Sequence, residues 1–154
     1  RYGRELERMS EHAVLNANYL RHRILHPGSD TAQRMHAMPL AGAPADVVKH
    51  AFTLSLSALK DAVGVTGRDV AKRLLDYGVM APTLYFPMIV PECLMIEPTE
   101  TESKEVMDRF ADDFHEILCE DPEVVTSAPH TTDVRRVDEV WAARNLVLRH
   151  PGPE

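Results

Sequence analysis

The sequence predicts an α+β fold in which a small antiparallel sheet carries helices on one face. Residues 50–57 alternate strictly between apolar and polar side chains, which is the period of a strand with one buried face. Two short apolar runs, 83–86 and 93–96, are bounded by prolines and fit strands better than helices. Residues 3–25 and 100–118 instead repeat their apolar side chains at helical spacing.

The composition is that of an ordinary soluble domain. The chain has 154 residues, 44% hydrophobic and 27% charged, which suffices for one core. Its net charge of −7 argues against a nucleic-acid partner, because phosphate contacts require basic side chains. We expect no membrane partner either, since no apolar run has spanning length and no signal peptide is visible. Cys93 and Cys119 fit no metal spacing, so free thiols and a cytoplasmic location are expected.

The first helix is expected from about residue 3 to about residue 25. Its apolar side chains recur at helical spacing, and His26-Pro27-Gly28 ends the pattern. Asn16 and Asn18 are interpreted as a hydrogen-bonded or solvated helix face. Residues 27–49 show little periodicity, so an irregular loop is expected there. The chain starts at Arg1 and enters a helical pattern almost at once, which suggests a domain cut from a longer protein.

The middle of the chain contains the clearest strand and a capped helix. Phe52, Leu54 and Leu56 form the apolar face of the strand at residues 50–57. After a turn at residues 64–67, Thr66 is expected to cap a helix over 68–77 that Gly78 ends.

The second half begins with two proline-bounded strands and a capped helix. Thr99 and Glu102 have the spacing of a capping box, which predicts a helix from about residue 100 to 118. Asp121-Pro122 breaks this helix, and residues 122–127 can form a further turn.

The end of the chain is expected to be less regular. Residues 128–132 are expected to be extended or a loop. A short helix is predicted over 137–144, with Val137, Val140 and Trp141 facing inward, and the tail at 150–154 is expected to fray.

Several stretches resemble one family. They are AVLNANYL at 13–20, VAKRLLDYG at 70–78, PTLYFP at 82–87, LMIEPTETE at 94–102 and APHTTDVR at 128–135. They resemble the C-terminal part of the glycine cleavage system P-protein, the pyridoxal-phosphate-dependent glycine dehydrogenase (decarboxylating), and most closely subunit 2 of its split form. The chain departs from the family at Ala51, where the family has glutamate, and at Asp133, where it has proline.

The resemblance covers nearly all of this chain but a third or less of a P-protein. It implies the small C-terminal domain of a fold-type I pyridoxal-phosphate enzyme, with residues 1–26 as a linking helix, 27–49 as a loop, 50–149 as the α+β core and 150–154 as a tail. The implied reaction releases CO2 from glycine and transfers the aminomethyl group to the lipoyl H-protein. The implied partners are the large pyridoxal-phosphate-binding domain, subunit 1 and the H-protein.

The same resemblance implies that this chain is catalytically incomplete alone. Its lysines, Lys49, Lys60, Lys72 and Lys104, lie outside any recognisable cofactor-lysine motif, which the family carries further upstream. We therefore expect no catalytic residue in this chain and no pyridoxal phosphate bound by it alone. The alternative is a stand-alone, non-enzymatic binding or regulatory domain derived from this family.

Five residues are candidates for a substrate cleft or an interface: His50, Tyr85, Glu97, Thr99 and His130. Each has a plainer explanation. His50 can be a solvated strand end, Tyr85 a core or interface aromatic, and Thr99 a helix cap. His130 can simply make a hydrogen bond within its loop.

Two further expectations concern metal binding and association. His115 and Cys119 lie four residues apart on a predicted helix, but two ligands without a third argue against a metal site. Residues 85–90 are too densely apolar to be buried wholly within one small domain. We therefore expect the isolated chain to form homo-oligomers through this segment.

Overall fold

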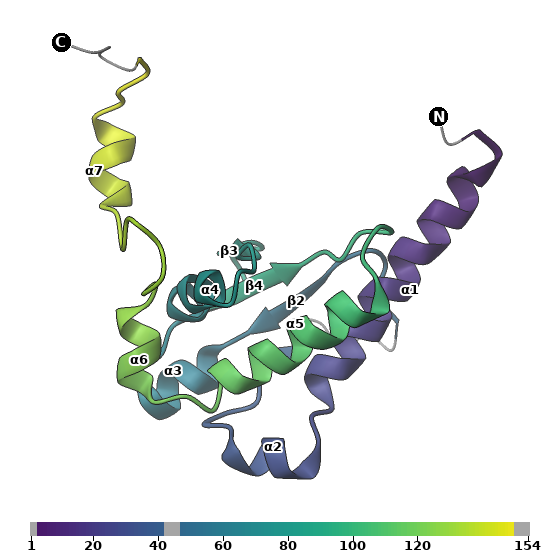
Figure 1. Cartoon of the computed structure of the whole chain (residues 1–154), viewed down its shortest axis with the longest axis horizontal. Helices are drawn as coiled ribbons and strands as arrows, with labels where there is room; N and C mark the ends of the chain where they lie inside the picture. The colour runs from purple at the N-terminus through teal and green to yellow at the C-terminus, as the bar shows by residue number, and fades with distance from the viewer. Residues whose placement is uncertain (1–2, 42–46, 150–154) are drawn as a thin grey trace.

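The computed structural model describes residues 3–41 and 47–149 and confirms an α+β fold (Figure 1). The expected tail at 150–154 lies outside the described residues. After a 3-10 turn at Gly3–Glu5, the elements follow in the order α1 (Leu6–Leu25), α2 (Ser29–Arg34), β1 (Leu40–Ala41), β2 (Phe52–Ser55), α3 (Ser57–Val63), α4 (Gly67–Asp76), β3 (Thr83–Leu84), β4 (Cys93–Ile96), α5 (Lys104–Ile117), α6 (Pro122–Ser127) and α7 (Glu139–Arg144).

The four strands form one antiparallel sheet in the order β1-β2-β4-β3. In the central pair, Phe52 lies opposite Ile96 and Leu54 opposite Leu94. All four side chains are buried and belong to the main hydrophobic core. The alternating pattern of residues 50–57 therefore identified the buried face of this strand correctly.

The opposite face of the central strands is partly covered by the loop between β3 and β4. Ser55 Oγ donates a hydrogen bond to the Pro91 carbonyl at 2.7 Å. Cys93 Sγ lies 3.0 Å from the Phe86 carbonyl oxygen, and Cys93 is fully buried. The base of this loop is thus held against the sheet by side chains of both central strands.

Helices α1 and α5 pack against each other beside the sheet (Figure 1). The contacting faces bury small and large apolar side chains, among them Ala17 and Ile24 of α1 and Ala111 and Phe114 of α5. His115 Nε2 lies 3.0 Å from the Ile24 carbonyl oxygen. Because this imidazole is buried, its hydrogen bond to α1 helps to fix how the two helices pack.

Helix α4 begins and ends as the sequence predicts. Thr66 accepts a hydrogen bond from the Asp69 N–H while Asp69 accepts one from the Thr66 N–H, which completes a capping box. Gly78 follows the helix with φ = 73°, a left-handed conformation that glycine adopts without strain.

The structure differs from the expectation in three segments. Residues 27–49, expected to be irregular, contain α2 and β1, with 42–46 outside the described residues. The strand predicted over 50–57 ends at Ser55, and the chain then forms α3, which the sequence pattern did not indicate. The helix expected from residue 100 starts only at Lys104.

The sequence predicted helix α7 correctly, but the apolar side chains that were expected to face inward are exposed. Val137, Val140 and Trp141 are 47%, 61% and 59% exposed, so they do not face inward. Figure 1 shows most of α7 projecting away from the sheet, and its first residue, Glu139, makes salt bridges to Arg68 and Lys72 of α4 at 3.1 and 3.6 Å. A helical apolar repeat marks a face that can be buried, and the described residues supply no surface that buries this one. Among the same residues, no helix has the length and apolar character of a membrane span.

Candidate functional site

Three of the five candidate residues meet in one cleft. The cleft, of about 380 Å³, lies between the first half of α1 and the segments that precede β2 and follow β4. Because Phe52 pairs with Ile96, the residues just outside the strand ends also lie close together. His50, Glu97 and Thr99 therefore line the same cleft, together with Lys49 and α1 residues such as Met9.

His50 and Glu97 lie side by side in this cleft. Their Nε2 and Oε1 atoms are 3.5 Å apart, and both side chains are more than half exposed. Solvent screens such a pair, so it adds little to stability. An imidazole and a carboxylate side by side in an open cleft can nevertheless both offer polar contacts to a ligand.

Thr99 does not cap α5, which corrects the sequence prediction. Ser103 is the N-cap, and its Oγ accepts a hydrogen bond from the Val106 N–H at 3.3 Å. Thr99 Oγ1 instead pairs with Thr101 Oγ1 at 2.9 Å. The Thr99 carbonyl accepts hydrogen bonds from the Glu102 N–H and from the Asn16 side chain of α1. These two hydrogen bonds hold residues 99–102 in a turn. The contact between Asn16 and this turn joins residues far apart in the sequence, so local spacing does not reveal it. Helix α5 therefore begins several residues later than the sequence predicted.

His130 lies outside this cleft, on the loop that follows α6. Its backbone N–H and that of Thr131 donate to Asp76 Oδ1 at 2.6 and 2.8 Å, and Thr131 Oγ1 donates to the same atom at 2.9 Å. Ser127 Oγ lies 3.1 Å from His130 Nε2. The imidazole itself is exposed, so the structure presents it on a loop whose backbone is fixed.

A nearly buried network of charges supports Asp76. Arg73 donates to Asp76 Oδ2 at 2.9 Å and makes two hydrogen bonds to Glu120 at 2.7 and 2.8 Å. Burial opposes ionisation of Asp76, but the hydrogen bonds from Thr131, His130 and Arg73 outweigh it and lower its pKa to about 2. Burial and the neighbouring Glu120 raise the pKa of Tyr77 to about 12.

The other end of the same loop is also fixed from α4. Arg136 Nη1 donates to Asp69 Oδ1 at 2.6 Å, and Arg136 Nε donates to the Ala128 carbonyl at 2.7 Å. Asp69, whose second oxygen completes the Thr66 capping box, therefore both starts α4 and anchors the loop. The Thr66–Asp69 spacing was a signal available in the sequence, whereas the pairing with Arg136, 67 residues away, was not.

Tyr85 lies apart from both places. It adopts φ = 61°, is 53% exposed and lines neither the cleft nor the His130 loop. It is therefore not a core aromatic. The neighbouring Phe86, Met88 and Ile89 are 57%, 89% and 90% exposed, so the apolar segment at 85–90 does lie on the surface as the sequence indicated.

The lysine environments do not fit a pyridoxal-phosphate Schiff base. Such a lysine reacts as the free amine, which a lowered pKa favours. Hydrogen bonding to Glu92 raises the pKa of Lys60, and hydrogen bonds to Asp108 and Tyr19 raise the pKa of Lys104. Lys72 lies 3.6 Å from Glu139. Lys49 lines the cleft, but Glu97 and Glu100 of the same cleft would repel the cofactor's phosphate.

His115 and Cys119 do not form a metal site. The His115 ring contacts the Ile24 carbonyl, while Cys119 Sγ lies 4.0 Å from the Thr31 carbonyl oxygen. Within residues 3–41 and 47–149, no three His, Cys, Asp or Glu side chains are grouped to hold a metal ion.

Known proteins share this sequence over most of its length. Residues 9–137 match the family model described as glycine dehydrogenase, C-terminal domain. The chain is 49% identical over 152 residues to the probable glycine dehydrogenase (decarboxylating) subunit 2 of Thiobacillus denitrificans, covering 96% of this chain and 29% of that protein. For the protein of the same name from Methylococcus capsulatus, the identity is 51% over 143 residues, covering 91% and 27%. The protein of the same name from Alkaliphilus oremlandii is 46% identical over 151 residues, which cover 96% of this chain and 28% of that protein.

The fold and the cleft define the class of this domain, and the comparisons define its family. The class is an α+β domain with a small antiparallel sheet and an open cleft at the strand ends. The chain belongs to the glycine dehydrogenase C-terminal domain family. It spans between 27% and 29% of the length of these relatives.

Proposed function

We propose that this chain acts as the C-terminal domain of a glycine dehydrogenase (decarboxylating) and that catalysis requires the remainder of such an enzyme. The observation that carries the proposal is the identity of about half over nearly the whole chain to proteins named subunit 2 of that enzyme. In the complete enzyme, pyridoxal phosphate would accept the electrons released when glycine loses CO2. The lysine environments of this chain favour a cofactor site in the part it lacks.

Two surfaces are suited to face the remainder of the enzyme. The first is the cleft in which His50 and Glu97 lie 3.5 Å apart, which can orient a polar ligand. The second is the loop of His130, whose backbone Asp76 fixes. A loop held by a nearly buried charge network presents its exposed imidazole in one defined position. The lipoyl H-protein and subunit 1 are proposed as the partners of the complete enzyme.

The assignment of the cofactor can be tested by borohydride reduction. The chain alone and a chimera are each mixed with pyridoxal phosphate; in the chimera this chain replaces the matching region of the Thiobacillus denitrificans relative. After reduction, mass spectrometry of peptides locates the adduct. We expect one stoichiometric adduct in the chimera, on a lysine outside this chain, and none in the chain alone. A stoichiometric adduct on Lys49, Lys60, Lys72 or Lys104 would overturn the assignment.

The alternative function, a non-enzymatic binding or regulatory domain, makes a different prediction for the same chimera. If the chain had diverged to such a role, the chimera would still fold and bind pyridoxal phosphate but would not decarboxylate glycine. The free thiols of Cys93 and Cys119 are consistent with a reducing compartment for either role, for which we propose the cytoplasm.

A further inference from the structure

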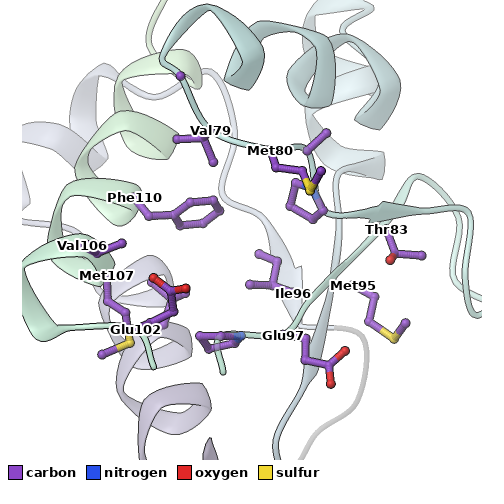
Figure 2. A pocket seen from close by; sticks show the side chains of 15 residues that line it. Val79, Met80, Thr83, Met95, Ile96, Glu97, Glu102, Val106, Met107 and Phe110 are labelled. Carbon is purple, nitrogen blue, oxygen red and sulfur yellow. The ribbon is translucent and has the colours of Figure 1, made fainter. Parts of the chain in front are cut away.

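A second hollow lies on the other side of the Glu97–Pro98 segment from the His50 cleft. This groove, of about 500 Å³, separates α5 from the segment that joins α4 to β3, and the end of β4 lines it as well (Figure 2). Its buried lining residues are Leu20, Ile96, Pro98 and Met107. A hollow of this size and apolar character is typical of sites that bind small organic molecules.

The charged residues among the fifteen that line the groove are both glutamates, Glu97 and Glu102. Glu97 is turned toward His50, 3.5 Å away in the neighbouring cleft. Glu102 reaches into the groove on the side of Phe110 and Met107 (Figure 2). Glu102 is exposed at the rim of the groove, and none of the salt bridges among the described residues includes it, so its carboxylate is available to a ligand.

The backbone of Glu102 is held in place by contacts outside the groove. Its N–H donates to the Thr99 carbonyl at 3.2 Å, and its own carbonyl accepts a hydrogen bond from Asn16 Nδ2 at 3.2 Å. The Asn16 side-chain amide also donates to the Thr99 carbonyl, at 2.8 Å. Asn16 is buried, so this turn is fixed from α1 and the backbone of Glu102 is in place before any ligand arrives.

We propose that the groove binds an organic cation with an apolar body, such as an arylalkyl ammonium ion. The ammonium group would pair with Glu102, and Phe110 would add attraction between the cation and its aromatic ring. Met80, Met95 and Met107 all line the groove, and their flexible thioethers adapt to apolar groups of varied shape. The net charge of −7 further favours a cation over an anion. The inference does not rest on the proposed enzymatic role, although the groove shares Glu97 and Pro98 with the His50 cleft.

The methionine methyl groups allow a direct test with phenylbutylamine as the probe. The chain has seven methionines, and selective ¹³C labelling gives each its own NMR signal. Met80, Met95 and Met107 report on the groove, Met9 on the His50 cleft and Met88 on the exposed loop. We expect saturable shifts at the three groove methionines and none at Met9 or Met88. Absence of saturable shifts at the groove, or shifts centred on Met9 or Met88, would overturn the proposal.

The role of the charge is tested with matched ligands and variants. Phenylbutanol and phenylbutyrate have the same apolar body without the positive charge, and we expect each to bind at least about tenfold more weakly. Glu102→Gln should weaken phenylbutylamine about tenfold, whereas Glu100→Gln, which lines the His50 cleft instead, should leave its affinity unchanged. Equal affinity for the amine and the alcohol, or an unchanged affinity in Glu102→Gln, would show an apolar hollow without cation recognition and refute the inference.

Discussion

Among single residues, Asp76 makes the most consequential long-range contacts. It lies at the end of α4, yet it holds the backbone of His130 and Thr131, more than fifty residues further along the chain. Its side chain is only 3% exposed, so the hydrogen bonds that it accepts from Arg73, His130 and Thr131 are needed to stabilise its charge there. Asp76 therefore fixes the loop that presents His130, one of the two surfaces proposed to face the remainder of the enzyme.

The pKa of Asp76 gives a testable dependence of stability on pH. A folded-state pKa of about 2, against 3.8 for an unperturbed aspartate, favours folding when the carboxylate is charged. The contribution, about 2 kcal/mol, is complete above pH 5 and is lost as the pH falls from 5 to 2. Urea unfolding of the wild type and of Asp76→Asn should therefore show their difference in unfolding free energy shrinking by about this amount. A difference that stays constant over this range would contradict the hydrogen-bond pattern.

The start of α5 gives a second prediction for single residues. Ser103 accepts the capping hydrogen bond, so Ser103→Ala should lower the free energy of unfolding by about 1 kcal/mol. Thr99→Ala removes only an exposed hydroxyl–hydroxyl contact, so it should change stability by less than about 0.5 kcal/mol. Urea titration measures both. The opposite order would place the cap at Thr99 after all.

Among the elements, the loop between β3 and β4 combines a fixed base with an exposed apolar tip. Ser55 and Cys93 hold the base through the Pro91 and Phe86 carbonyls. Met88 and Ile89, at the tip, are about nine-tenths exposed. A fixed loop loses little further conformational entropy on contact, which favours its use as an interface.

We predict that the isolated chain associates through this tip. Ile89→Lys should lower the average mass measured by light scattering at high protein concentration, because it places a charge in the contact. Leu15→Lys, which alters an equally apolar but distant residue of α1 that is 64% exposed, serves as the control and should leave association unchanged. Added salt should strengthen association by screening the net charge of −7. A wild type that stays monomeric at millimolar concentration would disprove the prediction.

Several elements were predictable from a strong local signal, although the capping-box spacing of Thr99 and Glu102 placed the start of α5 wrongly. The buried face of β2, the bounds of β4 and the capping box of α4 all follow from alternation, proline and cap spacing. Helices α2 and α3 were missed because each spans only six or seven residues and lacks a side-chain cap. Such short helices are stabilised mainly by tertiary packing, which local sequence patterns do not report.

For the whole molecule, the candidate site was only partly predictable. Strand pairing brought His50 and Glu97 together, and the residues had been singled out, but their partnership needed the register of β2 and β4. The anchors of the His130 loop, Asp69 and Asp76, join segments more than fifty residues apart, so no spacing revealed them. The exposure of the apolar face of α7 could not be predicted from the sequence either, because burial depends on surfaces outside the helix itself.

The most direct measurement of the central claim is CO2 release from carboxyl-labelled glycine by the chimeric subunit 2. It is assayed with the relative's subunit 1, pyridoxal phosphate and lipoyl H-protein, beside the unmodified relative and the isolated chain. We predict release by the chimera within about tenfold of the relative and none by the chain alone. A folded chimera that binds the cofactor but releases no CO2, or release by the chain alone, would contradict the account.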